Sequence, residues 1–250
     1  MNILVAMKQT PDLRQLRLRE RRPVLEGAPK TFGDLDKNAL EAAVALKAEG
    51  DKVTVLGVGD AELEDTVKEA LAAGADEAVL VLVGEGTPVG APDSRVTAAL
   101  LAAAVKTVEA PALLIMGEGS GDGYSGQVVG RVAELLGWPQ VGFARELRLE
   151  QGEVVAVRSL EDVLETVAVP LPAVVSVSAE INEPRIPAVT AILRAGRKPK
   201  RSLNAAELVV EPPPPGTRTL SALAPEVRRR GERLGGVADL AAVLADENLI

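Results

Sequence analysis

The segment PAVVSVSAEINEPRIPAVTAILRAGRK, residues 172–198, runs from a buried type of strand through a stiff polar loop into a basic stretch. Ala173–Ala179 is a short, mostly apolar run, as expected of a buried strand. Pro184 and Pro187 restrict the backbone of the loop and of the residues that precede them. Such a loop presents its side chains in a defined arrangement, which suits recognition of a partner. The alternative is an ordinary strand followed by a surface connection.

The chain upstream of this segment alternates between short apolar runs and helical apolar stripes. Strands are expected at Asn2–Lys8, Lys52–Val58, Glu77–Val83 and Ala112–Met116, and helices at Asp36–Glu49, Ala61–Ala73, Ser94–Glu109 and Gln127–Leu136. Ser94 is the expected N-cap of the third helix, after a loop rich in glycine and proline that runs to Asp93. Strands separated by helices of this length predict an α/β fold, with right-handed crossovers and a mostly parallel sheet that has helices on both faces.

After Trp138-Pro139 the pattern changes to short strands. Val141–Leu149 and Glu153–Leu160 flank Gln151-Gly152, which is typical of a hairpin, and the strands Glu165–Val169 and Ala173–Ala179 follow. We expect this antiparallel part to extend the same sheet, so that one α/β domain spans residues 1–201.

The C-terminal part of the sequence lacks the periodicity of the rest. Pro212–Pro215 is a stiff extended tract that fits neither a helix nor a central strand. A last helix is expected at Val237–Ala245, and its apolar residues share one face: Val237, Leu240, Ala241 and Leu244. Because a single short helix cannot bury such a face, residues 202–250 are expected to form an extended arm that packs on a partner subunit.

Composition narrows the possible functions. The chain of 250 residues contains no cysteine and no histidine, which excludes disulfides, thiolate metal sites and histidine-based catalysis, and no metal site is expected. The net charge of −8 argues against nucleic acid as the main partner, and the local arginine clusters favour solvated faces or contacts to an acidic protein. No apolar run reaches the roughly 18 residues of a membrane span. Because no signal peptide is expected, the expected location is cytoplasmic.

The stretch GEGSGDGYSGQ, residues 117–127, lies between an expected strand and an expected helix. Glycines let backbone amides approach a ligand closely, and the first turn of a helix offers free N–H groups to an anion. The stretch is therefore a candidate phosphate-binding loop, although a plain structural connection fits the residues equally well. Gly121–Gly126 also matches the dinucleotide pattern GxGxxG, but that pattern normally follows the first strand of its unit, whereas this stretch follows the fourth.

Several motifs, in order along most of the chain, resemble those of electron-transfer flavoprotein beta subunits. They are LVAMKQTPD in residues 4–12, DKNALEAA in residues 36–43, ALAAGAD in residues 70–76, the glycine-rich stretch 117–127, LGWPQ in residues 136–140, and LETVAVPLPAVV with NEPR in residues 164–185. The resemblance implies an adenine-nucleotide alpha-hydrolase-like fold, which is similar to that of the universal stress proteins.

The resemblance also implies ligands and a docking loop. Members of the family hold a structural AMP, and by position its contacts would come from Ala6, Gly33, Asp34, Leu35, Asp36, Val58, Gly117, Gly119, Gly121, Asp122, Gly123, Ser125, Gly126, Gln127 and Val128. FAD is held mainly by an alpha subunit and would lie near Leu13 and Leu35, which replace aromatic residues of some members. The loop near residues 177–199 would dock flavin dehydrogenases through Asn182, Glu183, Pro184, Arg185 and Val189.

The function implied by the resemblance is electron transfer, with no catalysis by this chain. It would form a heterodimer with the alpha subunit, accept electrons from flavin dehydrogenases such as acyl-CoA dehydrogenases, and pass them through a quinone oxidoreductase toward the respiratory chain. The main alternative is a stand-alone AMP- or ATP-binding module of the universal stress protein type, which needs neither the NEPR loop nor the arm. A third possibility is an NAD-dependent oxidoreductase, which would have to use lysine, Tyr124 or carboxylates as acid and base.

Overall fold

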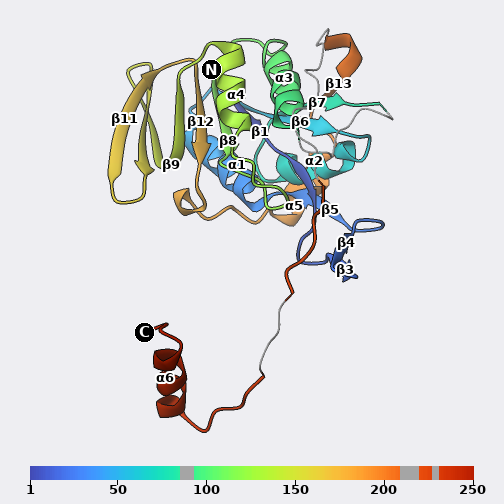
Figure 1. The fold of residues 1–250 in the computed structure, drawn as a ribbon. Helices are drawn as coiled ribbons and strands as arrows, with labels where there is room; N and C mark the ends of the chain where they lie inside the picture. Colours follow the sequence, from blue (N-terminus) through green and yellow to red (C-terminus); the bar gives the residue numbers. More distant parts are fainter. Residues whose placement is uncertain (85–92, 209–219, 227–230) are drawn as a thin grey trace.

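The computed structural model describes residues 1–84, 93–208, 220–226 and 231–250. Within them lies a nine-stranded sheet of order β11-β10-β9-β12-β8-β1-β6-β7-β13 (Figure 1). The parallel strands are β1 (Asn2–Ala6), β6 (Lys52–Gly59), β7 (Glu77–Leu82), β8 (Pro111–Gly117), β9 (Gln140–Glu150), β12 (Ala173–Val177) and β13 (Lys200–Asn204). At one edge, β10 (Glu153–Ser159) and β11 (Leu164–Pro170) continue the sheet in antiparallel fashion. The predicted α/β fold, with a mostly parallel sheet and an antiparallel extension, is confirmed. One strand expected in the antiparallel part is placed differently: β12 lies between β9 and β8 and is parallel to both. All of its residues are buried, as suits a central parallel strand.

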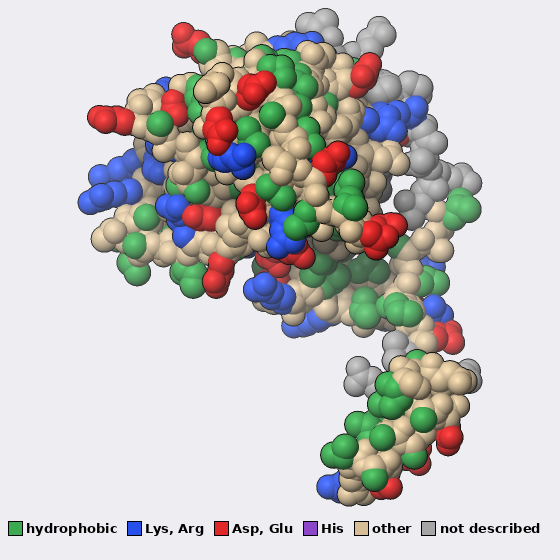
Figure 2. All heavy atoms as spheres, turned by 90° about the vertical axis from the view of Figure 1, so that its left-hand side faces the viewer, with side chains coloured by type: hydrophobic (Ala, Val, Ile, Leu, Met, Phe, Trp, Pro, Cys, Tyr) green, Lys and Arg blue, Asp and Glu red, His purple; other side chains and the backbone are tan. Residues whose placement is uncertain are grey.

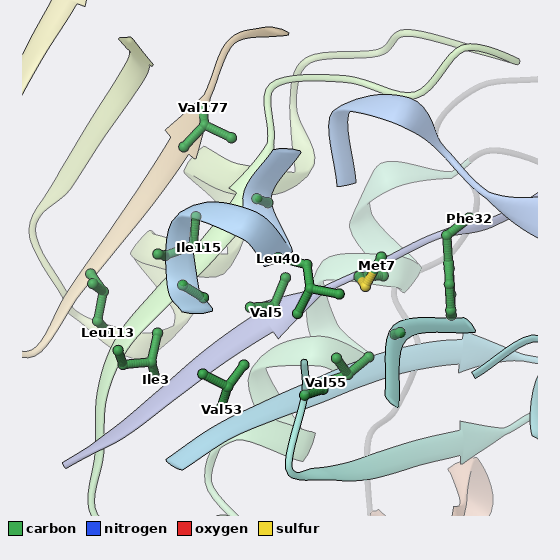
Figure 3. Close-up of a cluster of buried hydrophobic side chains, with 14 of the residues drawn as sticks. Ile3, Val5, Met7, Phe32, Leu40, Val53, Val55, Leu113, Ile115 and Val177 are labelled. Atoms are coloured by element: carbon green, nitrogen blue, oxygen red, sulfur yellow. The ribbon is translucent and has the colours of Figure 1, made fainter. Parts of the chain in front are cut away.

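Helices cover both faces of this sheet. α1 (Asp34–Leu46), α2 (Leu63–Ala72) and α5 (Val189–Ala195) pack on one face, and α3 (Ser94–Val105) and α4 (Val128–Leu136) pack on the other (Figure 1). Successive side chains of a strand point to opposite faces. In β1, therefore, Ile3 and Val5 belong to the first core and Leu4 to the second. Figure 3 shows the first of these cores, which is aliphatic except for Phe32.

The start of α3 corrects the predicted cap by one residue. Asp93, and not Ser94, is the N-cap, and its carboxylate accepts a hydrogen bond from the backbone N–H of Arg95. A carboxylate suits this position because it also interacts favourably with the helix dipole. Ser94 is the first helical residue, and its hydroxyl lies 3.1 Å from the side-chain oxygen of Gln127. The expected loop rich in glycine and proline falls largely on residues 85–92, outside the described residues.

Two small antiparallel pairs before α1 were not predicted. β2 (Gln9–Pro11) pairs with β5 (Lys30–Phe32), and β3 (Arg17–Arg19) pairs with β4 (Arg22–Val24). The β3–β4 hairpin projects away from the main sheet (Figure 1). Its strands are exposed on both faces, so the sequence shows none of the alternation between apolar and polar residues by which a strand is recognised.

The C-terminal part of the chain first packs against the sheet and α3 and then extends away from them. β13 pairs with β7 and crosses the expected boundary between residues 201 and 202, and η2 (Ala205–Leu208) packs against α3. The division of the chain into a domain and an arm at this point stays a prediction. The Pro212–Pro215 tract lies outside the described residues. The last helix, α6 (Val237–Asp246), is present as predicted, stands apart from the sheet and contains no buried residue (Figure 1).

Candidate functional site

The glycine-rich loop begins where the strand order of the sheet reverses. From β1 the chain proceeds to β6 and β7 on one side, whereas β8 lies on the other side of β1. Ala6 at the end of β1 is paired in register with Met116, one residue before Gly117. Ligands of open α/β sheets bind outside the carboxyl ends of the strands at such a switch point. The position of the loop therefore favours a ligand site over a plain connection.

The first turn of α1 packs directly against the end of β8. Asp36 is buried, and its Oδ2 accepts a hydrogen bond of 2.7 Å from the backbone N–H of Lys8. A Cβ at Gly117 would lie 2.9 Å from the Cβ of Leu35 and 2.9 Å from Oδ1 of Asp36. Real side chains do not come so close, so only glycine lets β1, β8 and α1 meet in this way.

Asp36 titrates near neutral pH in this environment. Burial raises its pKa to about 7, although hydrogen bonds from the backbone N–H groups of Lys8 and Gly117 favour the charged form and oppose this rise. The site thus contains a carboxyl group whose charge changes in the physiological range.

A charged pair connects the end of β1 to the glycine-rich loop. Nζ of Lys8 lies 2.7 and 2.8 Å from the two carboxylate oxygens of Asp122 and 3.3 Å from Oγ of Ser120. Partial burial raises the pKa of Asp122, but the hydrogen bonds with Lys8 and Ser120 outweigh it, so the pKa is lowered overall. Both side chains remain partly open to solvent, with 43% of Lys8 and 30% of Asp122 exposed.

The loop itself leads into the first turn of α4. The ring of Tyr124 lies flat against Gly119, where a Cβ would be 2.8 Å from ring carbons, and its hydroxyl donates to Glu118 at 2.7 Å. Gly126 has a φ of +63°, which side-chain-bearing residues rarely adopt. Gln127 then forms the N-cap of α4. The backbone N–H groups of the first helical turn have no intrahelical acceptor and so can bind an anion.

The structure brings the predicted nucleotide-binding residues to this one edge. Ala6 ends β1, Val58 lies near the end of β6, Gly33 to Asp36 begin α1, and residues 117–128 form the loop. The two leucines predicted to lie near the flavin border the same loop. A Cβ at Gly121 would be 3.0 Å from Cδ1 of Leu13, and Leu35 packs on Gly117. Lys8 was missed in the prediction, although a lysine directly after a buried strand is a usable signal for a site at the carboxyl edge.

The segment after β12 is fastened to α1 by two side-chain contacts. Asn182 and Asn38 exchange hydrogen bonds of 2.8 Å and 3.0 Å between side-chain amides and backbone carbonyls. The guanidinium of Arg185 makes two hydrogen bonds, of 2.6 and 2.8 Å, to the carboxylate of Glu41. These contacts hold the predicted docking segment in one conformation, which the two prolines alone do not determine.

Beyond these contacts the segment presents apolar side chains to solvent. Ile186, Val189, Ile192 and Leu193 are 93%, 73%, 56% and 75% exposed, respectively. Contiguous exposed apolar residues mark interaction sites in soluble proteins. Of these four, only Val189 was predicted. The sequence predicts a loop in this segment, so it does not reveal that α5 places Ile192 and Leu193 beside Val189.

Comparisons with known proteins agree with the motifs. Residues 24–208 match the model of the electron transfer flavoprotein domain family. The chain is 34% identical to electron transfer flavoprotein subunit beta of Thermoanaerobacterium thermosaccharolyticum, over 94% of this chain and 93% of that protein. The chain belongs to the electron transfer flavoprotein beta-subunit family. It is also 31% identical to the caffeyl-CoA reductase–Etf complex subunit CarD of Acetobacterium woodii (94% and 92% covered) and 35% identical to the subunit beta of Mycobacterium tuberculosis (84% and 81% covered).

Membership in the electron transfer flavoproteins gives the chain a role in electron transport, and a beta subunit implies an alpha subunit as its partner. The predicted family is confirmed. The two alternatives for the whole chain, a stand-alone nucleotide-binding module and an NAD-dependent oxidoreductase, are therefore set aside. Within the part of the chain that the structure describes, no helix combines the length and apolarity needed to span a bilayer.

Proposed function

We propose that this electron transfer flavoprotein beta subunit forms a heterodimer with an alpha subunit that holds most of an FAD, and that it works in the cytoplasm. The heterodimer takes electrons from flavin dehydrogenases, acyl-CoA dehydrogenases among them, and passes them to a quinone oxidoreductase. The observation that carries the proposal is the exposed apolar segment 186–193, fixed on α1 by the Asn182–Asn38 and Arg185–Glu41 contacts. A rigid apolar projection of this kind suits brief docking to several partners.

The residues at the carboxyl edge fit the two cofactors that the family implies. FAD supplies the redox chemistry, and this chain would contribute Leu13 and Leu35, whose apolar side chains exclude water from one side of the ring. AMP would lie along the glycine-rich loop, with its phosphate at the start of α4 and near the ammonium of Lys8. Gly126 supports this assignment because its φ of +63° favours glycine, which leaves the backbone open to close approach by a ligand. The AMP would be structural and take no part in redox chemistry. Mass spectrometry of the denatured heterodimer tests both assignments, and the absence of AMP from the purified complex would contradict the second.

Val189→Ala tests the docking segment. With 73% of its side chain exposed, Val189 contributes little to folding, so the thermal midpoint and the flavin spectrum should stay unchanged. Truncating an interface anchor should cost about 1–2 kcal/mol of docking energy, which corresponds to roughly a tenfold rise in apparent KM for the donor dehydrogenase. Val163, which is 56% exposed in the β10–β11 connection, provides the matched control, and Val163→Ala should leave the kinetics unchanged. Equal donor kinetics for Val189→Ala and the wild type would refute the assignment.

Lys8→Met tests the phosphate contact in the nucleotide site. Loss of a charge-assisted hydrogen bond of about 1.5 kcal/mol should weaken AMP binding roughly tenfold, as measured by calorimetry on nucleotide-free heterodimer. Adenosine lacks the phosphate, so its affinity should not change. Lys68→Met removes an ammonium that pairs with Asp65 on the surface of α2 and should affect neither ligand. Equal losses of affinity for AMP and adenosine would mean that Lys8 only stabilises the loop through its ion pair with Asp122 and does not contact the phosphate.

A further inference from the structure

The tip of the β3–β4 hairpin has an unfavourable backbone conformation. Glu20 and Arg21 connect the two strands, and their φ angles are 50° and 65°. Two-residue turns with both central residues in the left-handed region strongly favour asparagine and glycine. Glutamate and arginine adopt this region only at a cost in conformational free energy. Such a strained conformation persists where surrounding contacts stabilise it.

The contacts that hold the tip come from the C-terminal part of the chain. The backbone N–H of Ala224 donates to the carbonyl of Arg21 at 2.8 Å, and Nε of Arg21 donates to the carbonyl of Ala224 at 2.8 Å. Nη1 of Arg21 also lies 2.6 Å from Oε1 of Glu226. Among the described residues, the hydrogen bonds of residues 220–226 are all made with Arg21. The strained turn therefore supplies all the hydrogen bonds that fix this part of the described chain to the body.

The same hairpin carries a concentrated positive charge on an acidic protein. Residues 14–22 contain five arginines and one glutamate, a net charge of +4, whereas the whole chain has a net charge of −8. Arg17, Arg19 and Arg22 are exposed. Within the described residues, no carboxylate lies within 4.0 Å of their guanidinium groups, although Arg14 and Arg21 both have ionic partners.

Apolar side chains accompany these charges on both segments. Leu18 and Leu25 of the hairpin region are 58% and 59% exposed, and Leu220 and Leu223 beside Ala224 are 83% and 45% exposed. Exposed leucines next to unpaired arginines are the composition of a protein–protein interface, in which arginine is enriched. The hairpin region and residues 220–226, which meet at Arg21, thus both present side chains of this kind.

We propose that the β3–β4 hairpin is the base of the C-terminal arm, and that the hairpin and the arm together bind an acidic surface of the alpha subunit. Arg21 fixes the direction in which the arm leaves the body, and Arg17, Arg19 and Arg22 pair with carboxylates of the partner. The proposal rests on the heterodimer proposed above and on the expectation that residues 202–250 form an arm that packs on the partner subunit. A second copy of this chain is the less suitable occupant because it carries the same basic hairpin, and like charges would meet in a symmetric contact.

A charge-swap cycle on the full-length heterodimer tests the role of Arg21. Arg21→Glu and Glu226→Arg should each weaken binding of the alpha subunit about tenfold, and the double variant should recover most of the loss because the ion pair is restored in reverse. Lys52→Glu, at the amino edge of the sheet, is the control for a general effect of charge and should leave the affinity unchanged. The thermal midpoint of each single variant, measured on the isolated chain, shows whether that variant is folded.

The basic face is tested by the triple variant Arg17→Gln, Arg19→Gln, Arg22→Gln. Its affinity for the alpha subunit should fall, and the dependence of that affinity on sodium chloride should become flatter because long-range attraction is lost. If truncation at residue 212 releases the alpha subunit but the charge swap and the triple variant bind normally, the hairpin is not part of the interface. If truncation itself has no effect, the proposed role of the arm is wrong. Salt-sensitive self-association of the isolated chain, abolished in the triple variant while alpha-subunit binding stays normal, would assign the surface to a second copy and overturn the proposal.

Discussion

Removal of residues 212–250 should release the alpha subunit, and most of the FAD with it, while the nine-stranded sheet stays folded. α6 contains no buried residue, and Val237 and Leu240 on its apolar face are 84% and 45% exposed. Figure 2 shows apolar side chains along one side of this helix and acidic groups along the other. Burying such a face on a partner is worth at least about 3 kcal/mol, so its loss should weaken the heterodimer by a hundredfold or more.

Size-exclusion chromatography and flavin absorbance measure this result. The thermal midpoint of the truncated chain should be close to that of the isolated full-length chain, because no described residue beyond Leu208 belongs to the hydrophobic core clusters or packs against them. Leu240→Ser with Leu244→Ser is a milder variant that keeps the arm and removes only its apolar face, and it should weaken the heterodimer to an intermediate degree. An unchanged heterodimer after truncation would show that the arm does not hold the partner.

The second large effect concerns Asp36, whose burial should make stability depend on pH. Its pKa is about 7 in the folded protein, compared with 3.8 for an unperturbed aspartate. Between these values the folded state binds more protons than the unfolded state. The free energy of unfolding should therefore fall as pH rises from about 5 to about 7, by at most about 1.4 kcal/mol per pH unit.

Urea unfolding at several pH values provides the measurement. Asp36→Asn cannot ionise and keeps one acceptor for the N–H of Lys8, so it should unfold with a much weaker pH dependence in this interval. Glu41, Asp60 and Asp122 do not mask the effect, because their pKa values are lowered and they titrate below this interval. The same slope for Asp36→Asn and the wild type would show that another group is responsible.

The elements that the sequence predicts well are those with a strong apolar pattern. β1 and β8 are short runs of fully buried aliphatic residues, and a parallel sheet covered by helices is the arrangement that buries both of their faces. β13, by contrast, has the sequence KRSLN and lies at the sheet edge with its side chains mostly exposed. The β3–β4 hairpin is similarly exposed. Neither has an apolar pattern, because each is held by pairing with its neighbour and not by burial.

In the candidate site, too, the features with a strong local pattern can be predicted from the sequence, and the long-range contacts cannot. The glycine-rich loop is visible in the sequence because glycine at this density is unusual, and a helix follows it. The pairing of Lys8 with Asp122 and that of Arg185 with Glu41 join residues 114 and 144 positions apart. Contacts at this separation depend on the arrangement of the whole sheet. Asn182 and Arg185, predicted as docking residues, also make hydrogen bonds to α1 that the sequence does not reveal.

Co-expression of the chain with an alpha subunit, followed by purification and a visible spectrum, tests the central claim most directly. A one-to-one complex is expected that contains FAD, absorbs as an oxidised flavin and is bleached by a flavin dehydrogenase with its substrate. The chain purified alone should be colourless. A chain that purifies without the alpha subunit under these conditions, or a complex without flavin, would contradict its assignment as the beta subunit of a flavin-containing electron carrier.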